Sequence, residues 1–324
     1  MENRVIVILG CTASGKGTFA RHLARQLGGE IVSIDSMKVY RGLDIGTAKP
    51  SAADRAVIPH HLIDIADPWE PFSVARFVEL ADQAVAEIHG RGRPVVAVGG
   101  TMLYFKCFYH GLFEGPTADP QVRADIRRRA NTEGSEALHA ELARVDPAAA
   151  ARIHRNDLRR LERALEVYRL TGTPISRFQQ QWGAPTVRRP DWRWHLLGLR
   201  RPREEINRRI NERVRRMVAA GLVEEARRLW EDPRGVSAQA AQAVGYAELF
   251  AHFRGGGPGV SPGGVGVSPA TTLGEAIERI KINSRQLAKH QRTWLKRVAN
   301  VHWLVVPQGD ELPVLLREPR DLLI

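Results

Sequence analysis

The sequence predicts an α/β protein in which a parallel sheet is flanked by helices and carries a helical insertion domain. One observation is that short apolar runs alternate with longer amphipathic stretches toward both ends of the chain, which is typical of α/β folds. The other is a long arginine-rich segment between them, which has helical spacing and no strand pattern. We therefore predict a core of residues 1–118 and 190–324, and an insertion of residues 119–189.

The first elements follow one another as a strand, a glycine-rich loop and a helix. Val5–Leu9 is a continuous apolar run, as expected for a strand that is buried on both faces of a parallel sheet. After the loop, Phe19, Leu23 and Leu27 recur at helical spacing, which predicts an amphipathic helix that ends at Gly28. This unit begins the predicted sheet.

Two further predicted strands end next to polar residues. Glu30–Ile34 is followed directly by Asp35, and Pro94–Val98 is followed by two glycines and Thr101. Ligands of parallel sheets bind at the carboxyl ends of the strands. We therefore expect Asp35 and Thr101 to lie close to Lys16, which follows the first strand.

The remaining elements are assigned from periodicity and composition. They are helices over residues 74–88, 204–230 (interrupted near Gly221) and 274–297, and strands over residues 194–199 and 301–306. The Gly/Pro-rich stretch over residues 255–269 is expected to be a flexible surface loop.

Composition limits the classes of protein that fit. The 324 residues carry a formal net charge of +12, which favours a polyanionic partner such as nucleic acid, although a basic proteome would give the same balance. Cys11 and Cys107 form no CxxC pair, so neither a zinc site nor a disulfide is predicted. No apolar run approaches the roughly 18 residues of a membrane span. We expect a cytoplasmic protein without a membrane partner.

The segment after the first strand has the pattern of a phosphate-binding loop. Gly10 to Lys16 fits GxxxxGK, and it lies between a buried strand and a helix, where backbone N–H groups surround phosphate oxygens. The residues predicted to bind a pyrophosphate group are Gly10, Cys11, Thr12, Ala13, Ser14, Gly15, Lys16, Gly17 and Thr18. The sheet is therefore expected to be P-loop NTPase-like.

The position after Lys16 departs from this pattern. Gly17 stands where a serine or threonine usually contacts Mg²⁺. We still expect Mg²⁺ as a cofactor, held through water, Thr18 or Asp35. The loop by itself fits a kinase, an NTPase or an enzyme whose leaving group is pyrophosphate.

A series of further segments resembles the bacterial tRNA dimethylallyltransferases. They are residues 35–50 (DSMKVYRGLDIGTAKP), 59–64, 98–104, 111–116, 163–168 with 171–172, 209–214, 243–246, and 285–289 with 293–294. The matches come in order and extend over nearly the whole chain, so the series is more specific than any one motif. The resemblance implies transfer of a dimethylallyl group from dimethylallyl pyrophosphate to N6 of the adenosine 3′ of the anticodon in tRNA.

The resemblance also implies four catalytic residues. Asp35 is expected to be the general base that takes a proton from the attacking amine. Thr101 would hydrogen-bond the bridging oxygen of the leaving pyrophosphate, which Lys16 and Arg213 would stabilise. Structural roles remain open for three of them. Asp35 could cap a turn, and the Thr101 hydroxyl could hydrogen-bond the backbone of the turn after Gly99 and Gly100. Arg213 could be a solvated helix residue.

The predicted tRNA contacts form two groups. Basic residues of the insertion and of the C-terminal helix are expected to contact phosphates, unless carboxylates pair with them internally; they are Arg123, Arg159, Arg160, Arg163, Arg285 and Lys289. The resemblance implies a second group around the target base, formed by Asp35, Ser36, Met37, Lys38, Thr101, Gly245 and Tyr246. Lys38 and Met102 replace the Gln and Gly that the family commonly has, which leaves the preferred tRNA sequence context open.

Three alternatives stay open at this point. They are an isopentenyltransferase of free adenine nucleotides, a P-loop kinase of nucleosides or small molecules, and an RNA-binding protein without catalysis. The basic insertion argues against the first alternative, and the motif over residues 35–50 argues against the second. The expected partners are dimethylallyl pyrophosphate and the anticodon stem-loop of tRNA, and the expected state is a monomer.

Overall fold

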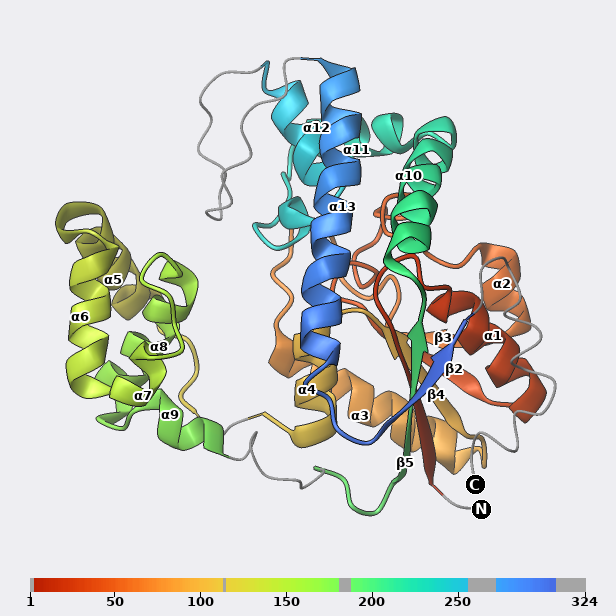
Figure 1. Cartoon of the computed structure of the whole chain (residues 1–324), viewed down its shortest axis with the longest axis horizontal. Helices are drawn as coiled ribbons and strands as arrows, with labels where there is room; N and C mark the ends of the chain where they lie inside the picture. The colour runs from red at the N-terminus through yellow and green to blue at the C-terminus, as the bar shows by residue number, and fades with distance from the viewer. Residues whose placement is uncertain (1–2, 113–114, 181–187, 256–271, 307–324) are drawn as a thin grey trace. The chain divides into compact units, whose positions relative to one another are not determined.

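The computed structural model describes residues 3–112, 115–180, 188–255 and 272–306 (Figure 1). Most of the Gly/Pro-rich stretch that was predicted as a surface loop lies outside these residues. The chain divides into two compact units. We name them the sheet unit, residues 1–108 and 189–324, and the helical unit, residues 109–188.

The sheet unit is built on one parallel sheet of six strands in the order β3-β2-β4-β1-β5-β6. The strands are β1 (Arg4–Leu9), β2 (Glu30–Ile34), β3 (His60–His61), β4 (Val95–Gly99), β5 (Arg193–Arg200) and β6 (Val301–Val305). The predicted parallel α/β class is confirmed. β3 escaped prediction because a strand of two residues has no periodicity to detect.

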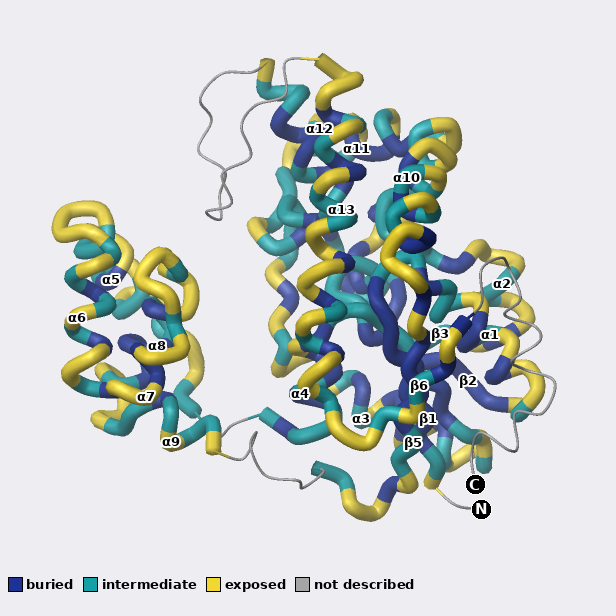
Figure 2. Tube along the Cα trace, in the orientation of Figure 1, coloured by how far each residue is buried: buried dark blue, intermediate teal, exposed yellow. Residues whose placement is uncertain are grey.

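Apolar side chains bury the central strand β1 on both faces. Ile6 and Ile8 join a core cluster with Phe19 and Leu23 of the first helix. Val5 and Val7 point to the opposite face, because successive strand residues alternate, and they are equally buried at 0% exposure. Figure 2 shows β1 and β2 buried along most of their length. This double burial is what the unbroken apolar run predicted.

Helices cover the sheet and rise beyond its carboxyl edge (Figure 1). They are α1 (Lys16–Leu27), α2 (Ala52–Val57), α3 (Val74–Gly90), α4 (Met102–His110), α10 (Arg203–Ala219), α11 (Leu222–Glu231), α12 (Tyr246–Phe253) and α13 (Leu273–Leu295), with the 3-10 helix η2 (Ala240–Gln242). The long predicted helix is two helices, because Gly221 takes a left-handed conformation with φ of 97° between α10 and α11. α10 and α13 lie side by side, and both reach the site described below.

The helical unit contains five helices in its described residues. They are α5 (Pro120–Glu133), α6 (Ser135–Val145), α7 (Pro147–Ala150), α8 (Leu158–Thr171) and α9 (Ile175–Phe178). Asp119 and Asp157 accept backbone N–H bonds at the beginnings of α5 and α8, as good N-cap residues do. Leu142 and Leu165 lie at the centre of a separate apolar core. This unit therefore has its own hydrophobic interior.

Candidate active site

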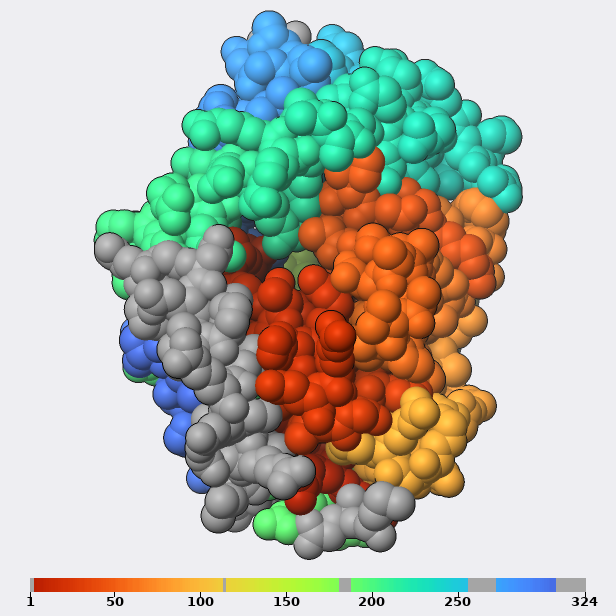
Figure 3. Space-filling view, turned by 90° about the vertical axis from the view of Figure 1, so that its right-hand side faces the viewer, coloured from red at the N-terminus to blue at the C-terminus, as the bar shows by residue number. Residues whose placement is uncertain are grey.

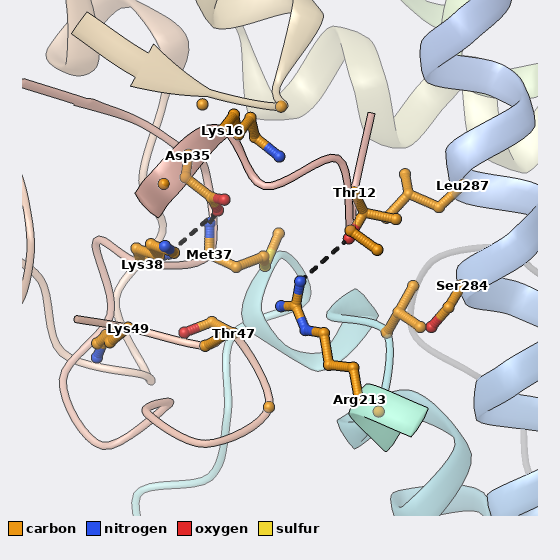
Figure 4. A pocket seen from close by; sticks show the side chains of 18 of the residues that line it. Thr12, Lys16, Asp35, Met37, Lys38, Thr47, Lys49, Arg213, Ser284 and Leu287 are labelled. Carbon is orange, nitrogen blue, oxygen red and sulfur yellow. Dashed lines mark hydrogen bonds between the residues drawn. The ribbon is translucent and has the colours of Figure 1, made fainter. Parts of the chain in front are cut away.

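The predicted convergence of polar residues occurs at a cavity of about 890 Å³ in the sheet unit. Lys16, Asp35, Thr101 and Arg213 all line it. The space-filling view shows a hollow between α10, in green, and the red and orange N-terminal segments (Figure 3). In the close view, Lys16, Asp35 and Arg213 reach toward the same space from three different elements (Figure 4).

The glycine-rich loop between β1 and α1 makes one wall of this cavity. Two of its residues have left-handed backbone conformations, Ala13 with φ of 63° and Gly15 with φ of 94°. The loop carbonyls are held by arginines: Arg209 Nε donates to the oxygen of Ala13 at 3.0 Å, and Arg201 Nε donates to that of Ser14 at 3.1 Å. Carbonyl oxygens that would repel a phosphate are therefore matched with cations.

A close approach of two strands brings Asp35 and Thr101 together. β2 and β4 are paired so that Ile34 lies opposite Gly99, and a Cβ on Gly99 would lie 1.8 Å from the Ile34 carbonyl oxygen. Only a glycine fits there. The same carbonyl accepts the backbone N–H of Thr101 at 3.3 Å, which fixes Thr101 beside the end of β2.

The hydroxyl of Thr101 is positioned by the residue after Asp35. The backbone N–H of Ser36 donates to Thr101 Oγ1 at 2.9 Å, and Thr101 Oγ1 donates to Ser36 Oγ at 3.2 Å. The donated N–H holds the oxygen in place, whereas the hydroxyl hydrogen can rotate. Thr101 can thus turn its O–H toward a ligand without moving its oxygen.

Asp35 divides its two carboxylate oxygens between two tasks. Oδ1 accepts the backbone N–H of Met37 at 3.0 Å and that of Lys38 at 3.4 Å, so the turn-capping role considered from the sequence is real. No donor in the described part of the chain bonds Oδ2. Asp35 therefore anchors its own loop with one oxygen and can offer the other to a substrate.

Three cations of the cavity have no carboxylate within ion-pair distance among the described residues. Lys16 Nζ donates to the carbonyl oxygen of Cys11 at 3.3 Å, and Arg213 Nη1 contacts Thr12 Oγ1 at 3.4 Å. Burial lowers the pKa of Lys16, the charge of Asp35 opposes this shift, and Arg213 adds to it. Burial likewise lowers the pKa of Lys38 to about 8. A site with uncompensated positive charge favours a polyanionic ligand.

Gln291 of α13 connects two walls of the cavity, and no pattern in the sequence indicated this role. Its Oε1 accepts the backbone N–H of Thr12 at 2.7 Å, and its Nε2 donates to the carbonyl of Gly100 at 2.8 Å. The glycine-rich loop is thereby tied to the segment that carries Thr101. Gln291 lies between two segments that resemble the family, 285–289 and 293–294, and a lone glutamine in a basic helix has no diagnostic spacing.

The segment after residue 43 is held by another buried carboxylate that sequence reasoning missed. Glu225 of α11 accepts the backbone N–H groups of Ile45 and Gly46 at 3.0 and 3.2 Å, and the Tyr246 hydroxyl donates to it at 2.5 Å. Tyr246 is fully buried. A buried side chain has no surface to offer a tRNA, so the contact predicted for Tyr246 is replaced by this internal one. Gly245 still lines the cavity.

The basic residues predicted to contact tRNA have different surroundings. In the helical unit, Arg123 Nε and Arg163 Nη1 donate to the buried carboxylate of Glu166 at 2.8 and 2.6 Å, which favours the structural interpretation for both. Arg160 pairs with Asp157 at 3.3 Å on the surface, and Arg159 is exposed with no ion pair in the described part of the chain.

In the sheet unit, the two predicted tRNA contacts of α13 also differ. Arg285 donates to Asn211 Oδ1 at 2.6 Å, and it is partly buried. Lys289 is exposed. Ser36 and Met37 line the cavity together with Asp35 and Lys38. Their contact with the target base stays a prediction.

The described residues around the glycine-rich loop hold no cluster of carboxylates that would bind a metal ion by itself. Gly17 supplies no hydroxyl, Thr18 lines the cavity but is exposed, and Asp35 keeps one oxygen, Oδ2, without a donor among the described residues. In the part of the chain that the structure describes, no group of three His, Cys, Asp or Glu side chains is arranged to hold a metal ion. The nearest atom to a Cβ placed on Gly17 would be Arg21 Nη1, at 3.8 Å. The guanidinium of Arg21 therefore lies next to Gly17, the position where a metal-binding hydroxyl is usual.

The chain matches one family of known proteins along most of its length. A family profile described as IPP transferase matches residues 38–298, and one described as isopentenyl transferase matches residues 3–58. The chain is 44% identical over 306 residues to a tRNA dimethylallyltransferase of Geobacter metallireducens, with 94% of both chains covered. It is 42% identical over 320 residues to one of Geobacillus thermodenitrificans, with 98% of this chain and 95% of the relative covered.

Solved structures show the same likeness. A full-length tRNA isopentenylpyrophosphate transferase from Bacillus halodurans has a TM-score of 0.67 and 39% identity, with 99% of this chain and 97% of that chain covered. A eukaryotic dimethylallyltransferase acting on tRNA has a TM-score of 0.77 and 26% identity, with 97% of this chain and 75% of that chain covered. Within the described residues, no helix combines the length and apolar character that a membrane crossing requires.

Proposed function

The chain belongs to the IPP transferase family, and from that premise we propose that it is a tRNA dimethylallyltransferase. It would transfer the dimethylallyl group of dimethylallyl pyrophosphate to N6 of the adenosine 3′ of the anticodon. The observation that carries this proposal is the arrangement of one cavity: a carboxylate with a free oxygen and a rotatable hydroxyl face cations that have no carboxylate partner.

The cationic wall suits the pyrophosphate half of the donor. During transfer, the bond between the allylic carbon and the bridging oxygen breaks, and negative charge accumulates on the pyrophosphate. Lys16 and Arg213 line the cavity at the glycine-rich loop, so both can stabilise that charge. Their partly buried positions strengthen the effect, because electrostatic interactions are stronger where water is excluded.

Thr101 lines the same cavity and is hydrogen-bonded to Ser36, the residue after Asp35. Its oxygen is held by the Ser36 N–H, so its hydroxyl hydrogen can donate to the bridging oxygen as that oxygen becomes negative. A hydrogen bond that strengthens in this way favours the transition state over the ground state. Gly99 makes the placement possible, because a side chain there would separate β2 from β4.

Asp35 suits the acceptor half of the reaction. The N6 amine of adenine is a weak nucleophile, and it loses a proton as its bond to the allylic carbon forms. Oδ2 of Asp35 can take that proton, while Oδ1 stays fixed by the N–H groups of Met37 and Lys38. The base must leave its stack to reach this cavity, as in other enzymes that modify a base.

The substrate and the cofactor belong to this proposal as well. The cationic wall of the cavity supports dimethylallyl pyrophosphate as donor, and exposed basic residues such as Arg159 and Lys289 support tRNA as acceptor. We propose a monomer, because donor and acceptor groups meet within one chain. Mg²⁺ stays a prediction: an ion could arrive on the pyrophosphate, and the described residues contain no group of three His, Cys, Asp or Glu side chains that would hold it by themselves.

A labelling experiment tests the proposed function. The protein is incubated with dimethylallyl pyrophosphate, labelled in its prenyl group, together with unmodified tRNA or AMP. We expect label in the tRNA at the adenosine 3′ of the anticodon. Label only in AMP would support the nucleotide isopentenyltransferase instead, and ATP turnover without prenyl transfer would support a kinase.

A further inference from the structure

We propose that Lys38 and Arg21 take the place of a metal ion, so that this chain binds the pyrophosphate of its donor without Mg²⁺. The inference rests on the proposed function, which supplies the pyrophosphate. It starts from two departures in one cavity. Gly17 lacks the hydroxyl that phosphate loops present to Mg²⁺, and Lys38 adds a further cation to the same cavity.

Arg21 lies beside the position of the missing hydroxyl. It follows Gly17 by one turn of α1, and its Nη1 would be the nearest atom to a Cβ at Gly17, at 3.8 Å. Its guanidinium pairs with Asp54 at 3.5 Å, and both side chains are partly exposed. A partly exposed ion pair is weak, so Arg21 can exchange this contact for a phosphate oxygen.

Lys38 faces the same region from the other wall. It lines the cavity beside Asp35. Burial lowers the pKa of Lys38, the charge of Asp35 opposes this shift, and the charges of Lys16, Arg213 and Arg21 add to it. An anion bound among these cations would relieve their repulsion and further stabilise the protonated form of Lys38.

The charge balance of the cavity also favours an anion over a metal ion. Its described lining contains two carboxylates, Asp35 and Asp54, and seven cationic side chains: Lys16, Arg21, Lys38, Lys49, Arg209, Arg213 and Arg216. Lys49 is paired with Asp44 and Asp64, which lie outside the lining, and Arg21 is paired with Asp54, so the surplus comes from the other five. A divalent cation would be repelled by this surplus, and it prefers oxygen ligands, which lysine and arginine lack. Ammonium and guanidinium groups instead donate charge-assisted hydrogen bonds to phosphate oxygens. The cavity is therefore built for a pyrophosphate and not for a metal.

Calorimetric titration with inorganic pyrophosphate tests this proposal on the unmodified chain. We expect the affinity in EDTA to be within about threefold of the affinity in Mg²⁺, because protein cations supply the charge. Binding that disappears in EDTA and returns with Mg²⁺ would overturn the proposal. This comparison needs no variant, so a folding defect cannot obscure it.

Substitutions identify the residues that supply the positive charge for pyrophosphate binding. Lys38→Gln should lower the affinity in EDTA by at least about tenfold, and Lys38→Arg, which keeps the charge, should retain it. Arg21→Gln should give a smaller loss. The double variant Gly17→Thr with Lys38→Gln restores the hydroxyl and removes the cation, so its affinity should rise on adding Mg²⁺. Equal affinities of Lys38→Gln and the unmodified chain in EDTA would contradict the role of Lys38.

A prenyl-transfer assay in parallel separates the two proposals. Transfer in Mg²⁺ together with loss of pyrophosphate binding in EDTA would overturn the metal-free binding and leave the proposed function intact. Absence of transfer to tRNA in both EDTA and Mg²⁺, with pyrophosphate still bound in EDTA, would instead contradict the proposed function.

Discussion

The cavity of the sheet unit and the surface of the helical unit are both rich in basic side chains, but these side chains have different partners. In the cavity, Lys16, Lys38 and Arg213 have no carboxylate within ion-pair distance among the described residues. In the helical unit, Arg123 and Arg163 share the buried carboxylate of Glu166.

Other arginines of the helical unit are paired in the same way. Arg129 is bound to Glu133 and Glu141 at 2.9 and 2.6 Å, and Arg169 is bound to Asp125 at 2.7 Å. A basic residue is available to a ligand only when the fold leaves it without a counter-ion. The comparison teaches that arginine density along the sequence overstates the surface available to RNA, whereas the few cations of the cavity are poised for an anion.

The largest effect should come from the residues that face the cavity cations. Asp35→Asn and Thr101→Val should each lower the single-turnover rate of prenyl transfer by about 10²–10³-fold, with little change in tRNA affinity. Asparagine retains an oxygen for the N–H groups of Met37 and Lys38, so the loop is preserved and only the proton acceptor is lost.

Ser73→Ala serves as a control for these two variants. It removes the N-cap hydroxyl of α3, away from the cavity lining, and should cost about 1 kcal/mol of stability without lowering the rate. Unaltered rates for the Asp35 and Thr101 variants would contradict their catalytic roles. They would also contradict the claim that the cavity, unlike the helical unit, keeps its charged groups available for a substrate.

The second effect concerns the carboxylate that holds the arginines of the helical unit. Glu166→Gln should lower the stability of that unit by about 2–4 kcal/mol, because it leaves two guanidinium groups around a site with no charge to match. Hydrogen exchange of α5 and α8 measures the loss. Glu162→Gln, at a more exposed carboxylate, should cost about 1 kcal/mol or less.

The same carboxylate predicts a pH dependence. Burial raises the pKa of Glu166, but hydrogen bonds from Arg123 and Arg163 outweigh this, so the pKa lies below its ordinary value. The stabilisation is thus present above the unfolded pKa of about 4.3 and is lost as the pH falls below it. Stability of the helical unit that is unchanged by Glu166→Gln would mean that its arginines do not depend on this pairing.

A third effect is the pH dependence of pyrophosphate affinity, which follows the protonation of Lys38. Its pKa of about 8 means that the cation is present at pH 7 and mostly lost at pH 9. Pyrophosphate affinity should therefore fall by about tenfold more across this interval in the unmodified chain than in Lys38→Arg, which stays protonated. The difference between the two chains cancels the ionisation of pyrophosphate itself. Parallel pH profiles would show that Lys38 does not contact the anion.

The smallest effect concerns the arginines that the helical unit leaves exposed. Replacing Arg159 and Arg160 by alanine should weaken tRNA binding by roughly three- to tenfold at low salt and less at high salt, because phosphate contacts are screened. Arg163→Ala should instead destabilise the unit, since it removes a partner of Glu166. A salt-independent loss for the Arg159 and Arg160 variant would mean that these residues are structural too.

Local patterns in the sequence determined the parts of the fold that depend on neighbouring residues. The apolar run of β1, the glycines of the following loop and the helical spacing of α1 each report burial and backbone geometry within a few residues. The topological rule for parallel sheets then placed Asp35 beside Thr101, and the register of β2 with β4 confirms it. β3 and α2 were missed because segments so short carry little periodicity.

By itself, the sequence thus determined the sheet class, the glycine-rich loop and the polar residues that meet at the strand ends, because all three follow from short-range patterns. Only the tertiary structure decided which charges are neutralised and which remain available. Glu166 is reached by Arg123 from 43 residues away, Glu225 holds Gly46 across 179 residues, and Gln291 holds Thr12 across 279 residues. Electrostatic pairing depends on distance in space, and no local pattern encodes which distant segment will supply the partner.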